Sequence, residues 1–166
     1  MEREAPFGPE ATIELVDCTL DPGRPDGEPR PTDYTARLAV RRDGTIEASG
    51  EIGTFTKWEE GRSYQLSGVV ESPDGAPAVL TTYFSGSMGY ERGSTTLTVY
   101  AREAASFASV FDVTATSVDI AVAADRTLAK ITLCNGGCDY QSSDPSTTET
   151  FELRFDGKAV TKRATP

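Results

Sequence analysis

Apolar and polar residues alternate on both sides of the dipeptide Asp43-Gly44. Tyr34, Ala36, Leu38 and Val40 precede it at every second position, and Ile46, Ala48, Gly50 and Ile52 follow it with the same spacing. Charged arginine and glutamate residues occupy several of the positions between them. Side chains alternate between the two faces of a strand, so this pattern predicts two strands that share one buried face, with Ile46 on it. Because Asp-Gly tolerates the positive φ of a two-residue turn, the segment is predicted to be a β-hairpin.

Three more dipeptides of the same kind lie between apolar runs and predict further hairpin turns: Asp74-Gly75, Asn135-Gly136 and Asp156-Gly157. The residues around the first of these, 64–70 and 78–84, are rich in β-branched and aromatic side chains, which favour strands. Another strand is predicted over 95–101. Between Phe151 and Phe155, apolar and charged residues alternate, which is typical of a strand with one buried face.

Three segments depart from this pattern. The alanine-rich stretch 102–111 has Phe107, Val110 and Phe111 at helical spacing, which predicts one short helix, with a strand from Phe107 as the alternative. Residues 21–33 are rich in proline and glycine, which do not sustain a strand ladder, so we expect a surface loop there. Residues 1–10 are expected to be flexible.

The pattern as a whole predicts a single all-β domain over residues 1–166, with about nine to eleven strands and at most one short helix. A chain of 166 residues buries about 70% of the surface that it exposes when unfolded, which is enough for a core of its own. Strands of this kind form either an antiparallel β-sandwich or a closed barrel. Alternation does not separate these two architectures, and we favour the sandwich.

The charge of the chain narrows the range of partners. Acidic residues outnumber basic ones by ten, giving a pI near 4.5, and the basic residues are scattered along the sequence. Nucleic acids and anionic membrane surfaces require a clustered positive patch, so neither is an expected partner. No apolar run approaches the roughly 20 residues of a membrane-spanning helix, and we therefore expect no membrane insertion.

The sequence contains no histidine. Nucleophile–histidine pairs and imidazole zinc sites are therefore excluded, and three cysteines are one short of an all-thiolate zinc site. No loop follows the calcium-binding pattern of alternating oxygen ligands. We expect no catalytic residues, no metal and no cofactor. A glycosidase that uses two carboxylates is the enzymatic alternative.

The three cysteines are Cys18, Cys134 and Cys138. Cys134 and Cys138 flank Asn-Gly-Gly, and a three-residue turn would place them opposite each other on two strands, within reach of a disulfide. A bridge from Cys18 to either of them is the alternative pairing. The C-x3-C spacing differs from the C-x-x-C of redox motifs, which favours a structural disulfide over redox or metal chemistry. Because such bridges persist in oxidising compartments, we expect an extracytoplasmic or secreted protein whose signal has been removed, with the cytoplasm as the alternative.

Two aromatic residues are candidate binding residues. Trp58 lies among polar residues after a predicted strand, and Tyr90 lies in a glycine-rich segment. Exposed aromatic rings stack on sugars or anchor protein interfaces. From these residues we predict a non-catalytic β-domain that recognises a protein or carbohydrate. The alternatives are a closed barrel that binds a small apolar ligand and a structural subunit of an assembly.

Overall fold

The computed structural model describes residues 3–19, 32–57, 64–86, 93–138 and 144–165. Within these ranges the chain forms twelve strands and no helix. In chain order the strands are β1 (Glu4–Pro6), β2 (Thr12–Thr19), β3 (Thr32–Arg42), β4 (Thr45–Lys57), β5 (Tyr64–Glu71), β6 (Pro77–Ser85), β7 (Ser94–Glu103), β8 (Ser106–Ala115), β9 (Ser117–Val122), β10 (Ala129–Gly136), β11 (Ser146–Phe155) and β12 (Val160–Ala164).

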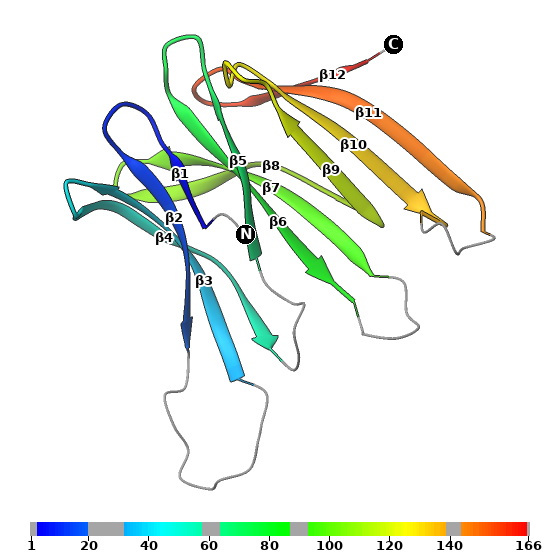
Figure 1. Ribbon diagram of the computed structural model, residues 1–166, viewed down its shortest axis with the longest axis horizontal. Helices are drawn as coiled ribbons and strands as arrows, with labels where there is room; N and C mark the ends of the chain where they lie inside the picture. Colours follow the sequence, from blue (N-terminus) through cyan, green and yellow to red (C-terminus); the bar gives the residue numbers. More distant parts are fainter. Residues whose placement is uncertain (1–2, 20–31, 58–63, 87–92, 139–143, 166) are drawn as a thin grey trace, which may run out of the picture.

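The strands make three antiparallel sheets of four strands each (Figure 1). We call β1–β4 the first sheet, β5–β8 the middle sheet and β9–β12 the last sheet. Within each sheet, hydrogen-bonded neighbours are also neighbours along the chain, so each sheet is a simple meander. The three sheets do not close into a barrel. The prediction of a sandwich-like all-β fold is therefore confirmed, and the barrel alternative is wrong.

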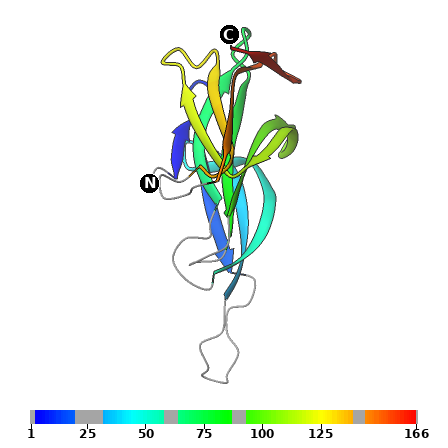
Figure 2. The same ribbon diagram turned by 90° about the vertical axis from the view of Figure 1, so that its right-hand side faces the viewer.

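The middle sheet contributes apolar residues to a core on each of its two faces. On β6, the consecutive residues Ala78, Val79 and Leu80 are all fully buried. Val79 packs in a core cluster with residues of the first sheet, such as Leu38, whereas Leu80 packs in another with residues of the last sheet, such as Phe151. The first and last sheets therefore cover opposite faces of the middle one. The sheets lie side by side in Figure 1 and overlap when the molecule is turned by 90° (Figure 2).

The short helix predicted over 102–111 is wrong, and the alternative strand forms in its place. The chain reverses at Ala104 and Ala105, and β8 begins at Ser106. The helical spacing of the apolar residues comes from a β-bulge opposite Val99 and Tyr100. The bulge lets Phe107 contact the first sheet while Phe111 packs in the core shared with the last sheet. A switch of face within one strand thus imitates a helical pattern.

A second bulge corrects the predicted position of Ile46. Two register shifts interrupt the pairing of β3 with β4, and one falls between Val40 and Arg41, opposite Ala48 and Ile46. As a result Ile46 is 50% exposed, although Ala48 is buried as predicted. The residue between them, Glu47, accepts hydrogen bonds from Arg42 at 2.6 Å and Arg102 at 3.2 Å. These bonds, that from Arg42 most of all, lower the pKa of the Glu47 carboxyl.

Three of the four predicted hairpin turns form. Asp43 and Gly44 adopt φ of 48° and 78°, as a two-residue turn of type I′ requires, and Gly75 has a φ of 80°. The Asp156 side chain accepts hydrogen bonds from the backbone N–H groups of Lys158 and Ala159, both at 2.8 Å, which lowers its pKa. The turn predicted at Asn135-Gly136 is wrong, because β10 continues through both residues and pairs Gly136 with Ser146.

Residues 1–10 were expected to be flexible, and residues 21–33 were expected to form a surface loop. Residues 4–6, inside the stretch expected to be flexible, form β1 and pair with β2. Most of the predicted loop over 21–33 lies outside the described residues, and residues 32 and 33 already belong to β3. The additional strands β1 and β8 explain why twelve strands are described where about nine to eleven were expected.

The connections between strands differ in length at the two ends of the molecule. At the end where β1, β3, β5, β7, β9 and β11 finish, turns of two to six residues join the strands, and we call it the turn end. β2, β4, β6, β8 and β10 all finish at the opposite end, which we call the loop end, and only the β8–β9 connection there is short, consisting of Thr116 alone (Figure 1). The connections 20–31, 58–63, 86–93 and 137–145 start there. Antiparallel meanders separate alternate connections in this way, and all three sheets are aligned alike.

We predict that the core of the middle sheet dominates stability. Leu80→Ala removes a fully buried side chain and should lower the free energy of unfolding by about 2–5 kcal/mol. Ile46→Ala truncates a half-exposed side chain and should cost no more than about 1 kcal/mol. Urea unfolding of both variants measures the difference. Equal losses would contradict the assignment of the middle sheet as the core.

Candidate functional site

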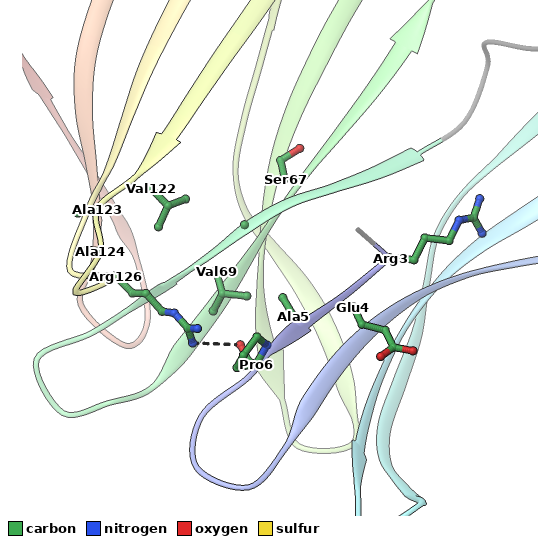
Figure 3. A pocket seen from close by; sticks show the side chains of 11 residues that line it. Arg3, Glu4, Ala5, Pro6, Ser67, Val69, Val122, Ala123, Ala124 and Arg126 are labelled. Atoms are coloured by element: carbon green, nitrogen blue, oxygen red, sulfur yellow. Dashed lines mark hydrogen bonds between the residues drawn. The ribbon is translucent and has the colours of Figure 1, made fainter. Parts of the chain in front are cut away.

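The described residues include an open groove of about 700 Å³ where the edges of the three sheets meet. It is lined by β1 with the preceding Arg3, by residues 67–69 of β5, and by residues 122–124 and 126 at the β9–β10 turn. Each of these strands is the edge of its own sheet. Ala5, Val69 and Val122 lie along its walls, and Arg126 reaches across to Pro6 (Figure 3).

Arg126 ties the three sheets together at one end of this groove. Its backbone carbonyl accepts a hydrogen bond from Glu71 N–H of β5 at 2.8 Å. Its guanidinium donates to the Pro6 carbonyl of β1 at 3.3 Å and to the Glu71 carboxylate at 3.4 Å. The residue has a φ of 58°, which costs an L-residue roughly 1–2 kcal/mol. A glycine there would avoid this cost, and the bonds of the guanidinium are the reason we find for the arginine.

The remaining features of the groove restrict what it can bind. The edge strand β1 is three residues long and includes Pro6, which has no backbone N–H to offer a further strand. β5 carries a bulge between Leu66 and Gly68, and a Cβ at Gly68 would lie 2.6 Å from Val122 of β9. A short strand, a proline and a β-bulge each hinder the pairing of a sheet edge with a further strand. We therefore interpret this groove as the joint between the sheets.

A row of aromatic rings connects the first sheet to the middle sheet near the loop end. Tyr34 stacks on Phe55 with ring centroids 5.4 Å apart, and Phe55 meets the edge of Tyr64 at 6.0 Å. Tyr64 in turn stacks on Tyr83 at 4.6 Å. A Cβ at Gly53 would overlap the Tyr64 hydroxyl, so glycine is required for this ring to pack on β4. The row ends on the middle sheet with two parallel tyrosines.

Hydroxyl groups gather beside these two tyrosines. Cross-strand pairing aligns Tyr64, Tyr83, Thr96 and Thr114 in one row across the middle sheet. The next row toward the turn end has Thr98 and Asp112 on β7 and β8, and the row after it has Tyr100 and Ser109. We call this set the hydroxyl surface: Tyr64, Tyr83, Thr96, Thr98, Tyr100, Ser109, Asp112 and Thr114.

Hydrogen bonds and partial burial hold the side chains of the hydroxyl surface in place. The Thr96 and Thr114 hydroxyls are 2.8 Å apart, and Tyr100 donates to the Ile52 carbonyl of β4 at 3.4 Å. Burial raises the pKa of Tyr64 above its ordinary value, and repulsion from Tyr100 adds to this effect. The pKa of Tyr100 is also raised, mainly by burial, although its hydrogen bond with Thr98 opposes the shift. Both phenols therefore stay neutral and keep a proton to donate.

The structure brings together two of the three candidate cysteines. Cys134 and Cys138 form a disulfide with their Cα atoms 5.9 Å apart. The expected geometry is wrong, because Thr148 and Ser117, and not Cys138, lie opposite Cys134 on the neighbouring strands. The bridge instead fastens the start of the β10–β11 connection to the end of β10. Cys18 is free and exposed on β2, so the alternative pairing does not form.

The other predicted site residues are not placed by the structure. Trp58 and Tyr90 lie outside the described residues, in connections that start at the loop end. Among the residues that are described, no three histidine, cysteine, aspartate or glutamate side chains come together as a metal site. The ranges described also contain no helix that is long and apolar enough to cross a membrane. The hydroxyl surface was missed by sequence reasoning, because its members belong to four strands.

Comparisons of the chain with protein-family models, with curated proteins and with solved structures found no match. The arrangement of its own residues therefore carries the functional argument.

We predict that Arg126 is held in its left-handed conformation by the bonds it makes. Arg126→Ala should lose these bonds and keep the backbone strain, whereas Arg126→Gly should lose the bonds and relieve the strain. The glycine variant should therefore be more stable than the alanine variant by about 1 kcal/mol. Chemical denaturation of both measures this. Equal stability of the two variants would refute the proposed strain.

A second prediction concerns the thiols. Alkylation of the folded protein without reductant should modify Cys18 alone, because the other two cysteines are bridged and Cys18 is exposed. Intact-mass measurement should show one added group, and Cys18→Ser should show none. Three added groups would contradict the disulfide.

Proposed function

We propose that this chain is a non-catalytic, extracytoplasmic recognition domain that binds a protein or carbohydrate partner through its loop end. The observation that carries the proposal is the alignment of the three sheets, which places the starts of the connections 20–31, 58–63, 86–93 and 137–145 at one end. Connections held by a rigid β-scaffold are a common location for binding residues. The candidate aromatics Trp58 and Tyr90 belong to two of these connections.

The described strand ends support the same location. The aromatic row from Tyr34 to Tyr83 lies near the loop end, and Phe84, which follows Tyr83 on β6 and points to the opposite face, is 41% exposed. Large aromatic side chains supply much of the binding energy in recognition surfaces. At the turn end, by contrast, hydrogen bonds within tight turns occupy residues such as Asp125 and Asp156. The turn end also carries Ile46, which is 50% exposed, so the two ends differ in exposed aromatic side chains and not in apolar exposure as such.

Chemical arguments support the proposal that the domain is non-catalytic and extracytoplasmic. A chain without histidine lacks the side chain that most often acts as a general base near neutral pH. The Cys134–Cys138 disulfide supports an oxidising compartment, since cytosolic thiols are generally kept reduced. A closed barrel around an apolar ligand is no longer an alternative, because the sheets do not close. A structural role in an assembly predicts a stable oligomer, which light scattering at high protein concentration tests.

We predict that a partner contacts the loop end and not the turn end. A photo-crosslinking amino acid is placed at Phe84 in one variant and at Asp74, an exposed turn-end residue, in the other. Each variant is exposed to the medium and cell-surface extract of the source organism and to an immobilised glycan panel. Specific adducts or glycan photolabelling should appear from position 84 only. Equal labelling from both positions, labelling from position 74 only, or no labelling from either contradicts the proposal. So does release of reducing sugar from any glycan that is bound.

A further inference from the structure

One face of the middle sheet changes character from one side to the other. This face is turned toward the first sheet, and on β5 and β6 it is apolar and buried, as at Val69 and Val79. On β7 and β8 the same rows continue with Thr98, Ser109 and Asp112. Ser109, Asp112 and Thr114 are exposed there. Along these cross-strand rows, the buried apolar surface on β5 and β6 therefore passes into an exposed polar surface on β7 and β8.

The position of β4 explains why this half of the face is exposed. β4 reaches β8 at the turn end, where Ser49 N–H donates to the Ala105 carbonyl at 2.9 Å and Gly50 packs on Phe107. Farther along the sheet, β4 contacts the middle sheet through Tyr100, whose hydroxyl reaches the Ile52 carbonyl, and through Tyr64, which packs on Gly53 and Phe55. Beyond Tyr100, the side chains of β8 on this face are exposed. The first sheet thus covers the β5–β6 half of this face, including part of Tyr64 and Tyr83, and leaves Ser109, Asp112 and Thr114 on β8 exposed.

We propose that the hydroxyl surface binds a neutral carbohydrate. The inference rests on the proposed function and names the class of ligand for one part of it. Seven of the eight side chains in the surface carry hydroxyl groups, each of which donates and accepts hydrogen bonds. Sugar hydroxyls have the same dual capacity, so a polyhydroxylated ligand satisfies such a surface without leaving donors or acceptors unpaired.

Aromatic rings provide the second requirement of a sugar site. Tyr83 ends the stacked row at its edge on the hydroxyl surface, next to Thr96 in the cross-strand register. The C–H groups on one face of a pyranose ring are apolar and pack against an aromatic ring. The packing of Tyr83 on Tyr64 holds the ring in place before any ligand arrives, which reduces the entropy lost on binding.

Charge selects among carbohydrates. Asp112 is the only charged side chain of the hydroxyl surface, and its carboxylate accepts hydrogen bonds from sugar hydroxyls. The described cation nearest to it along this face is Arg102, two rows toward the turn end, and Arg102 is occupied by Glu47 and by the Ala104 carbonyl. A sulfated or uronic acid ligand would meet a like charge with no cation to offset it. Neutral sugars are therefore favoured over anionic ones.

The outer face of the last sheet offers a matched control. There Thr132 and Thr150 are paired across β10 and β11 with their hydroxyls 3.3 Å apart, and Asp119 on β9 extends the same row. Asp119, like Asp112, is exposed on a strand beside threonines. This row has no aromatic neighbour on its face among the described residues. It shares the hydroxyl and carboxylate chemistry with the proposed site and lacks the ring.

The experiment titrates the full chain with neutral oligosaccharides of glucose, galactose, mannose and N-acetylglucosamine, and with sulfated and uronate oligosaccharides as the anionic arm. Calorimetry or chemical-shift mapping measures affinity. A neutral sugar should bind, and Asp112→Asn should weaken it about tenfold or more, because the amide removes the negative charge and replaces one acceptor oxygen with an N–H donor. Asp119→Asn should leave affinity within about twofold. Thr114→Val, at an exposed position, should also weaken binding, and unchanged thermal unfolding confirms that these variants fold.

Three outcomes would overturn the inference. One is tighter binding of the anionic sugars than of the neutral ones. Another is a neutral sugar whose affinity falls equally in Asp112→Asn and Asp119→Asn, or in neither. If binding of that sugar is lost in the Trp58→Ala variant instead, the proposed function stands and only the assignment of the hydroxyl surface as the binding site is wrong. The third is the absence of any sugar binding. In that case a protein adduct from position 84 would still support recognition through the loop end, whereas no adduct would remove both proposals.

Discussion

The fold depends on the burial of both faces of the middle sheet. A four-stranded sheet with apolar residues on both sides is not stable alone in water, so another layer must cover the apolar part of each side. The fully buried run Ala78-Val79-Leu80 shows this constraint most directly, because its side chains alternate between the two core clusters. The first and last sheets each need to bury only one face, so their outer faces carry polar and charged residues. The order of the layers follows from this difference.

Where the three sheets meet, the residues at their edges have hydrogen-bonding and packing requirements of their own. Edge strands of all three sheets approach one another around Arg126, whose backbone carbonyl and guanidinium bond to Glu71 and Pro6 beside the apolar side chains of the groove. Arg126 has its backbone in the left-handed region, and its long side chain has several donors. It forms hydrogen bonds with groups on the first and middle sheets. Most of the groove there results from the way in which the edges of the three sheets meet. This groove is therefore a poor indicator of function in this molecule.

The functional proposals follow from how the layers overlap. Because the first sheet covers only the β5–β6 half of the facing side, the β7–β8 half remains exposed with its threonines and Asp112. The aromatic row crosses from one sheet to the other at the border of these halves. Packed aromatic rings beside open hydroxyl groups, near the end where the long connections start, distinguish this area from the other described surfaces. The turn end, where Asp125 and Asp156 bond to backbone N–H groups of their own turns, offers no such combination.

Local patterns in the sequence determined much of the secondary structure. Alternation around Asp43-Gly44, Asp74-Gly75 and Asp156-Gly157 predicted strands and turns correctly, because a hairpin is specified by the period of its side chains and by the φ preference of two residues. The same reasoning failed where pairing partners intervened. The bulges that expose Ile46 and turn Phe107 and Phe111 to opposite faces exist only because a neighbouring strand sets the register. The pairing of Cys134 with Cys138 was predicted from their spacing, but the predicted register, with the two cysteines opposite each other across a turn, is wrong.

Tertiary structure alone decided how the sheets are stacked and which residues meet between them. Period-two alternation shows that a strand has an apolar side and leaves open which sheet covers it, and a run such as Ala78-Val79-Leu80 does not name its two partners. The link from Arg126 to Pro6 spans 120 residues of sequence, and the hydroxyl surface takes its members from four strands. Such groupings depend on long-range pairing and on the order of layers. Neither is encoded in any local stretch of the chain.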